Sequence, residues 1–270
     1  MNTKKIAVIL ISTVFALVVL FSCVGLLAVR KVEVSYAVSD ERNVTDIQAV
    51  LDKYVGKNLL FLSEEEVKQS ISGEYHLEVL SVQKRFPNVL SVSIRERKEV
   101  YYLNTGDRTL ILDKAGFIVN SFMGTPTENS EIITLSFSTP TPSVKPIEVY
   151  STLAGNNIRT DNDKVVYEVF NIAEQVGLTD CIKSIEVIDA TMDNFHVLFE
   201  TRTGVEIHVY DILKDGLSKC VKGFEVYDTV ASDYQKRFGE IRCFYVEGSN
   251  TFRIMHAYDG QNDILYDQEI

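Results

Sequence analysis

Three side chains in the second half of the chain have types and spacing that could hold a metal ion or move a proton. They are His196, Glu200 and His208, and they fall in two stretches, 195–200 and 205–209, that alternate as β-strands do. Imidazole and carboxylate groups are common zinc ligands and general bases. In a strand, however, His196 and Glu200 are neighbours on one solvated face. The pattern therefore predicts no metal site, and an envelope hydrolase using these residues stays as an alternative.

Other chemical motifs are missing from the sequence. It has no H-E-x-x-H, C-x-x-C, G-x-S-x-G or glycine-rich phosphate loop. Ser81-Val82-Gln83-Lys84 fits S-x-x-K, but it lies in a predicted strand and no S-D-N or K-T-G accompanies it. We therefore predict no catalytic residue, no cofactor and no metal, and expect a binding protein.

An uncharged apolar run from Ile6 to Val29 lies between Lys4-Lys5 and Arg30-Lys31. As a helix it is ~36 Å long, enough for a hydrocarbon core of ~30 Å. The run predicts a transmembrane signal-anchor at 6–29 after a short cytoplasmic tail, 1–5. The basic residues slightly favour a cytoplasmic N-terminus and extracytoplasmic domains.

Three other interpretations compete for the same run. A cleaved signal peptide usually has a shorter apolar core and ends in a small-x-small site, which is missing here. A lipoprotein signal would use Cys23, but Val24–Val29 stay apolar after it. A buried core helix is rarely apolar on every face and flanked by basic pairs.

The chain beyond Lys31 is acidic and globular in composition. It holds all 38 Asp and Glu and 23 of the 27 Lys and Arg, a net charge of about −15. Such a module is not expected to seek nucleic acid or anionic lipid. Cys181, Cys220 and Cys243 are an odd number, and we expect buried small hydrophobic residues rather than bridges.

The first part of this module has the patterns of a small α+β domain. Leu90, Val92 and Ile94 alternate with polar residues, which predicts a strand with one buried face. Thr45 is a candidate N-cap, and Ser63 and Glu66 have the spacing of a capping box. The predicted elements are a strand at 31–38, helices at 46–54 and from Ser63 to Gly73, and strands at 77–86 and 89–96.

The rest of the module reads as antiparallel strands with two helices. Gly106-Asp107 predicts a hairpin between 101–103 and 109–112, and 113–116 turns into a strand at 117–119. The proline-rich stretch 121–146 reads as a mostly extended connection. Further on we predict a helix from Asp161 or Asn162 to Gly177, strands at 182–188, 195–200 and 205–209, a helix at 211–228, a strand at 240–246, and a strand or exposed arm at 251–258.

The motif Phe86-Pro87-Asn88 followed by an alternating strand and Glu96-Arg97 resembles the POTRA domain of the bacterial division proteins FtsQ and DivIB. Lys98 and Glu99 stand where that family usually has a proline. The later elements resemble the family's second, β-rich domain, and Glu240-Ile241-Arg242 resembles its acidic-Leu-Arg signature. The resemblance implies a POTRA-like domain at 31–98, an FtsQ-type β domain at 99–250 and a C-terminal strand or tail at 251–270.

The resemblance also implies a function. Members of the family are non-catalytic scaffolds of the divisome. Their β domain binds the coiled-coil partner FtsB or DivIC, which acts with FtsL. Through this complex they help to regulate septal peptidoglycan synthesis. On this chain it implies a single-pass protein at the division septum. A POTRA-bearing component of a sporulation or secretion channel is an alternative. The implied partner-binding residues are Ile241, Cys243, Tyr245, Val246, Glu247, Phe252, Ile254 and His256.

Overall fold

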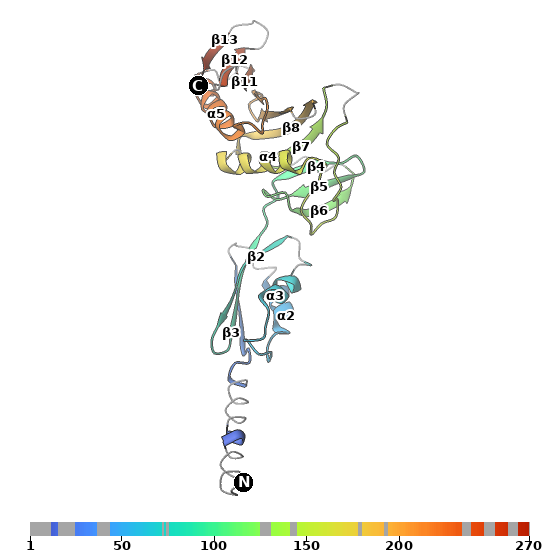
Figure 1. The fold of residues 1–270 in the computed structure, drawn as a ribbon, viewed down its shortest axis with the longest axis vertical. Coiled ribbons are helices and arrows are strands. Elements are labelled where there is room, and N and C mark those ends of the chain that lie inside the picture. The colour runs from blue at the N-terminus through green and yellow to red at the C-terminus, as the bar shows by residue number, and fades with distance from the viewer. Residues whose placement is uncertain are drawn as a thin grey trace, which may run out of the picture. The chain divides into compact units, whose positions relative to one another are not determined.

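The chain folds into two compact units, Met1–Arg97 (unit 1) and Lys98–Ile270 (unit 2), in the computed structural model (Figure 1). Each unit is described by itself. The structure describes residues 12–15, 25–36, 44–71, 73, 76–124, 131–140, 145–177, 180–191, 194–233, 239–245, 252–258 and 264–269.

Unit 1 is a three-stranded sheet with two helices against one face. The strand order is β1-β3-β2, with β1 parallel to β3 and β2 antiparallel to it. The predicted order of strand, helix, helix, strand, strand is confirmed. The elements are β1 (Lys31–Tyr36), α2 (Val44–Asp52), α3 (Glu64–Ile71), β2 (Leu77–Arg85) and β3 (Val89–Glu96).

The predicted buried face of β3 forms the centre of the unit 1 core. Leu90, Val92 and Ile94 are fully buried, and they pack with Leu51 of α2 and Val67 of α3. The helix prediction at 46–54 was displaced by two residues. Thr45, the expected N-cap, lies inside α2, and the chain turns after Asp52. α3 begins directly after Ser63, as the capping-box spacing predicts.

Unit 2 is built on a ten-stranded sheet in the order β13-β12-β11-β10-β9-β8-β7-β4-β5-β6. Three neighbouring pairs are parallel, β4 with β7, β7 with β8 and β10 with β11. The strands are β4 (Tyr101–Asn104), β5 (Arg108–Leu112), β6 (Ile118–Met123), β7 (Ile133–Ser138), β8 (Ile182–Thr191), β9 (Asn194–Thr201), β10 (Glu206–Val209), β11 (Gly239–Tyr245), β12 (Phe252–Tyr258) and β13 (Ile264–Glu269).

Two helices complete unit 2, α4 (Asp163–Val176) and α5 (Gly216–Asp233). α4 contributes Val165, Val169 and Ile172 to the core, and Gly177 ends it in a left-handed conformation, as predicted. α5 packs closely on β11. A Cβ on Gly223 would lie 2.9 Å from the sulfur of Cys243, so a glycine is needed for this approach.

Two predictions for unit 2 need correction, and one open alternative is resolved. The stretch read as a mostly extended connection contains β7, which lies in the sheet between β4 and β8. The helix expected at 211–228 starts at Gly216, because Asp211 and Asp215 have positive φ values of 52° and 51° and the chain turns there. Residues 252–258 form β12, paired to β11, so this stretch is a strand rather than an exposed arm, and β13 pairs with β12 beyond it.

The predicted membrane helix at 6–29 lies mainly outside the described residues, which include 12–15 and 25–29 of it. Within the described part of the chain, we find no helix that is both long and apolar enough to cross a membrane.

Candidate functional site

Polar and aromatic side chains gather on the side of β9, β10 and β11 that faces away from α5. On each strand the alternate residues, such as Ile207 and Cys243, point into the core beneath α5. The register pairs Glu206 with Glu200 on one side and with Glu240 on the other. This polar face consists of His196, Leu198, Glu200, Glu206, His208, Tyr210, Glu240, Arg242 and Phe244.

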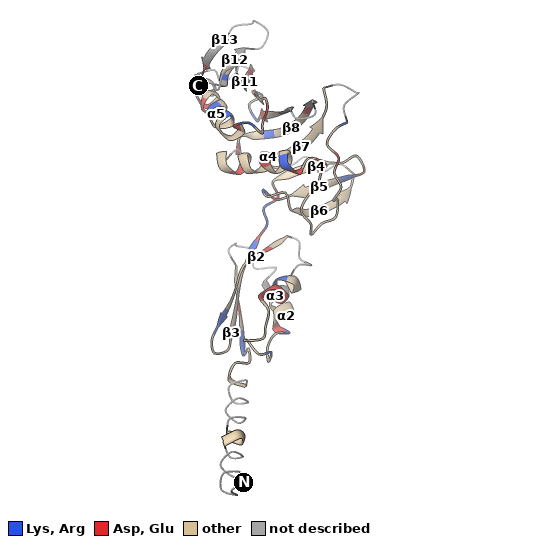
Figure 2. Cartoon of the chain, in the orientation of Figure 1, with Lys and Arg blue, Asp and Glu red and all other residues tan. Residues whose placement is uncertain are grey.

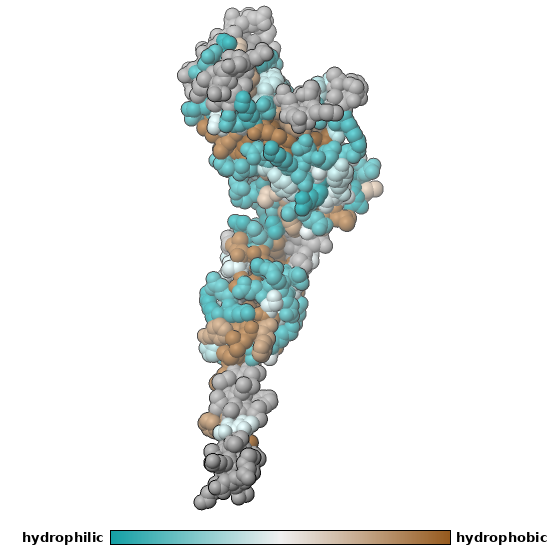
Figure 3. Space-filling model, viewed as in Figure 1, coloured by the Kyte–Doolittle hydropathy of each residue, from teal (hydrophilic) through white to brown (hydrophobic). Residues whose placement is uncertain are grey.

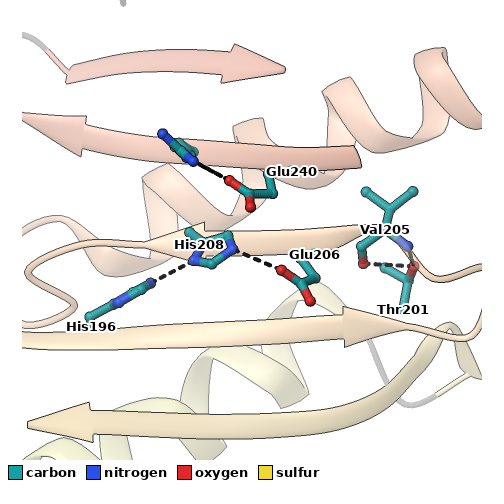
Figure 4. Close-up of polar contacts among 7 residues, drawn as sticks. His196, Thr201, Val205, Glu206, His208 and Glu240 are labelled. Carbon is teal, nitrogen blue, oxygen red and sulfur yellow. Dashed lines mark hydrogen bonds and ion pairs between the residues drawn. The ribbon is translucent and has the colours of Figure 1, made fainter. Parts of the chain in front are cut away.

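A hydrogen-bonded row crosses the polar face from β9 to β10 (Figure 4). His196 Nε2 lies 3.0 Å from His208 Nδ1, and His208 Nε2 lies 3.3 Å from Glu206 Oε2. A carboxylate accepts hydrogen bonds, so His208 donates from Nε2 and His196 donates to His208 when both rings are neutral. Tyr210 stacks on His196 with ring centroids 4.2 Å apart.

His196 is partly buried beneath its neighbours rather than solvated as the sequence suggested. Burial, and to a lesser extent the nearby His208, together lower the pKa of His196 to about 4. At neutral pH the His196 ring is therefore uncharged. The side chain of His208 is only 14% exposed, which fixes the ring within the row.

The predicted trio of His196, Glu200 and His208 is only partly assembled. The two histidines meet, but Glu200 is held by the ammonium of Lys183 at 2.6 Å and the hydroxyl of Ser184 at 2.7 Å. The Lys183 hydrogen bond lowers the pKa of Glu200. Glu206 takes the place expected for Glu200, because it lies two residues before His208 on the same face of β10, whereas Glu200 lies opposite Glu206 on β9.

Glu206, His208 and Glu240 offer donor atoms within 4.8 Å of one another, a spacing that could hold a divalent cation. Arg242 already supplies positive charge at this point, since its Nε donates to Glu240 Oε2 at 2.8 Å. The arrangement is thus balanced by a guanidinium group. Sequence reasoning missed Glu206 and Glu240, although Glu206-x-His208 and Glu240-x-Arg242 share the period of a strand face.

The partner-binding residues implied by the resemblance lie on β11, on β12 and between them. Ile241, Cys243 and Ile254 are fully buried in the unit 2 core. Burial raises the pKa of the Cys243 thiol to about 12. Tyr245, Phe252 and His256 belong to paired strands, but the structure does not describe their side chains. Val246 and Glu247 lie outside the described residues.

The surface available near these residues is the outer strand of the sheet and the polar face. β11 and β12 have neighbours on both sides, whereas β13 is paired only with β12 among the described strands. One side of β13 thus presents backbone N–H and C=O groups for another strand. On the polar face, Arg242 of β11 is exposed and Phe244 is partly buried, and β12 lies between these residues and β13.

The chain has a partial likeness to a known protein. No family model matches the chain. The "Cell division protein DivIB" of Clostridium acetobutylicum is 28% identical over 64 residues, which is 24% of this chain and 26% of that protein. The match thus spans about a quarter of the length of this curated relative. It suggests a link to the division protein family and a role in cell division.

Proposed function

We propose that the protein is a non-catalytic, single-pass scaffold of the cell-division machinery, with a cytoplasmic N-terminus and both units outside the cytoplasm at the septum. Unit 1 serves as a POTRA-like domain and unit 2 as an FtsQ-type β domain. It binds bitopic coiled-coil partners of the FtsB/DivIC and FtsL kind and so helps to regulate septal peptidoglycan synthesis. The apolar run 6–29 and the likeness to DivIB support this proposal.

The observation that carries the proposal is the open side of β13. A partner strand that pairs there satisfies backbone groups which water otherwise solvates, and the main-chain ladder supplies affinity. Specificity then comes from parts of the partner that extend over the polar face, where β11, two strands from β13, offers Arg242 and the aromatic ring of Phe244. Binding of this type needs the sheet edge, so the buried side chains of Ile241, Cys243 and Ile254 act by holding β11 and β12 in place.

Proline substitution tests this edge directly. In an antiparallel ladder, successive residues point their N–H groups to opposite sides. One of Tyr266→Pro and Asp267→Pro therefore removes a donor toward β12, and the other removes a donor from the open side. The variant of the open side should lower recovery of the two coiled-coil partners from crosslinked cells by about tenfold, equivalent to about 1.4 kcal/mol.

The matched control is the opposite edge of the same sheet. Asn120→Pro and Ser121→Pro alter β6, whose only described neighbour is β5. These variants should leave partner recovery unchanged. If both β13 variants recovered as much of the two partners as the wild type does, the proposal that a partner strand pairs with the open side of β13 would be refuted. A fluorescent fusion that spread evenly around dividing cells, with normal division on depletion, would refute the division role.

A further inference from the structure

Backbone hydrogen bonds join the last residues of the apolar run to the loop that follows α2 in unit 1. Val29 donates to the carbonyl of Lys57 at 2.8 Å and accepts from Gly56 at 2.8 Å. Leu59 donates to the carbonyl of Leu27 at 2.8 Å. The loop 55–61 is therefore fixed beside the last residues of the apolar run.

The turn between β2 and β3 lies at the same end of unit 1. Arg30 donates to the carbonyl of Asn88 at 2.8 Å, directly before β1 starts. β1 runs parallel to β3 from this point, with Lys31 opposite Val89. We call the surface formed by residues 26–31, 53–61 and 85–88 the basal surface of unit 1.

Exposed apolar side chains are concentrated on the basal surface. Leu26, Val55, Leu60, Phe61 and Phe86 are 58%, 50%, 54%, 81% and 56% exposed. Among the described residues of unit 1 beyond Phe15, the other large hydrophobic side chain in this class is Leu80, at 45%. Figure 3 shows a brown area at the end of unit 1 from which the N-terminal segment leaves. Such clustering marks a contact surface rather than scattered exposure.

Basic residues surround these apolar side chains. Arg30, Lys31, Lys53, Lys57 and Arg85 are all exposed, and Figure 2 shows basic residues at this end of unit 1. Glu33 pairs with Lys31 and Arg85, and Glu66 pairs with Lys57 at 2.8 Å. Five cations thus face two paired carboxylates and the exposed Asp52. The basal surface is locally basic although the chain as a whole is acidic.

We propose that the basal surface rests in the membrane interface, with Leu60 and Phe61 inserted at the boundary of head groups and acyl chains. This inference rests on the proposed membrane tether. If residues 6–29 span the bilayer, the hydrogen bonds of Val29 hold loop 55–61 at the level where the span ends. Apolar and aromatic side chains flanked by Lys and Arg are the composition of interfacial segments. The contact would fix the direction in which unit 1 leaves the membrane.

The absence of tryptophan from the chain allows a direct test. Phe61→Trp in the full chain, reconstituted into vesicles that contain brominated lipid, places a single tryptophan on the basal surface. We expect a loss of most of its emission to bromine quenching and a blue shift of the remainder. Leu80→Trp is the control, because position 80 is six residues along β2 from Phe86, about 20 Å at 3.3 Å per residue. Phe86→Trp is a second basal probe if Phe61→Trp does not fold.

The outcomes separate the basal contact from the tether. Quenching at position 61 or 86 without quenching at position 80 supports the contact. Unquenched emission at both basal positions, in protein that floats with the vesicles, overturns the contact and leaves the tether intact. Protein that does not float with the vesicles overturns both.

Discussion

Replacing Gly116 with alanine should destabilise unit 2 for two separable reasons. The residue has φ +80°, and a left-handed conformation costs an L-residue about 1–2 kcal/mol. A Cβ there would also lie 2.5 Å from Cε2 of Phe170 and 3.1 Å from Cγ2 of Ile158. Phe170 is 2% exposed, and the centroid of its ring lies 5.0 Å from that of Tyr101, so the Phe170 ring has little room to move. Overpacking of this kind adds about 1–3 kcal/mol.

Gly106 provides the matched control in the same unit. It has φ +89° in the turn between β4 and β5, and a Cβ there meets no atom within 4 Å. Gly106→Ala should therefore lose only the conformational part, about 1–2 kcal/mol. The difference between the two variants, about 1–3 kcal/mol, measures the contact with Phe170 and Ile158.

Hydrogen exchange at increasing urea concentration, read by mass spectrometry, reports unit 2 peptides separately from those of unit 1. The stability of unit 2 should fall in the order wild type, Gly106→Ala, Gly116→Ala, while unit 1 peptides stay unchanged. Equal losses in the two variants would refute the reasoning, because they would show that Phe170 and Ile158 move aside freely.

Two further perturbations address the polar face and α5. The pKa of His196 is about 4 in the folded chain against a usual 6.5, so the unfolded chain binds more protons between these values. The contribution of neutral His196 to stability is complete above about pH 6.5 and is lost as the pH falls toward 4. The melting temperature of His196→Phe should therefore fall less steeply than that of the wild type as the pH is lowered. Lys219→Met should destabilise unit 2 by about 2 kcal/mol in urea unfolding, because buried Lys219 donates to the carbonyls of Tyr210 and Asp211. Lys222→Met on the same helix, where the side chain is 42% exposed, should change stability by less than about 0.5 kcal/mol. Equal effects of the two substitutions would contradict the role of Lys219.

Local periodicity predicted the strands with a clear alternation, including β1, whose partner β3 is distant in the sequence. The alternation of Leu90, Val92 and Ile94 predicted β3 and its buried face. β7 was missed as a strand because it is a short stretch within a region rich in Pro, Ser and Thr, a composition that indicates a connection. The start of α5 was misplaced because Ile212 and Leu213 continue the apolar spacing of a helix. The backbone at Asp211 and Asp215 interrupts that helix.

The polar face shows the same limit at the level of side chains. The period of a strand predicted that His196 and Glu200 share a face. It did not fix the register in which His208 pairs with Leu198, which places His208 beside His196 rather than beside Glu200. Glu240 and Arg242 reach this face through the parallel pairing of β10 with β11, after the whole of α5. Strand register is a long-range property, so the site could not be assembled from spacing alone.

The parallel pairing of β1 with β3 has a mechanical consequence. The first strand of unit 1, β1, starts at Lys31, and its last strand, β3, ends at Glu96. Tension between those two points pulls the strands along their common axis in opposite directions. The backbone hydrogen bonds between the residue pairs from Lys31–Val89 to Tyr36–Ile94 then bear the force together in shear, instead of breaking one after another. Unit 1 is therefore built to transmit force from one end of its sheet to the other without unravelling.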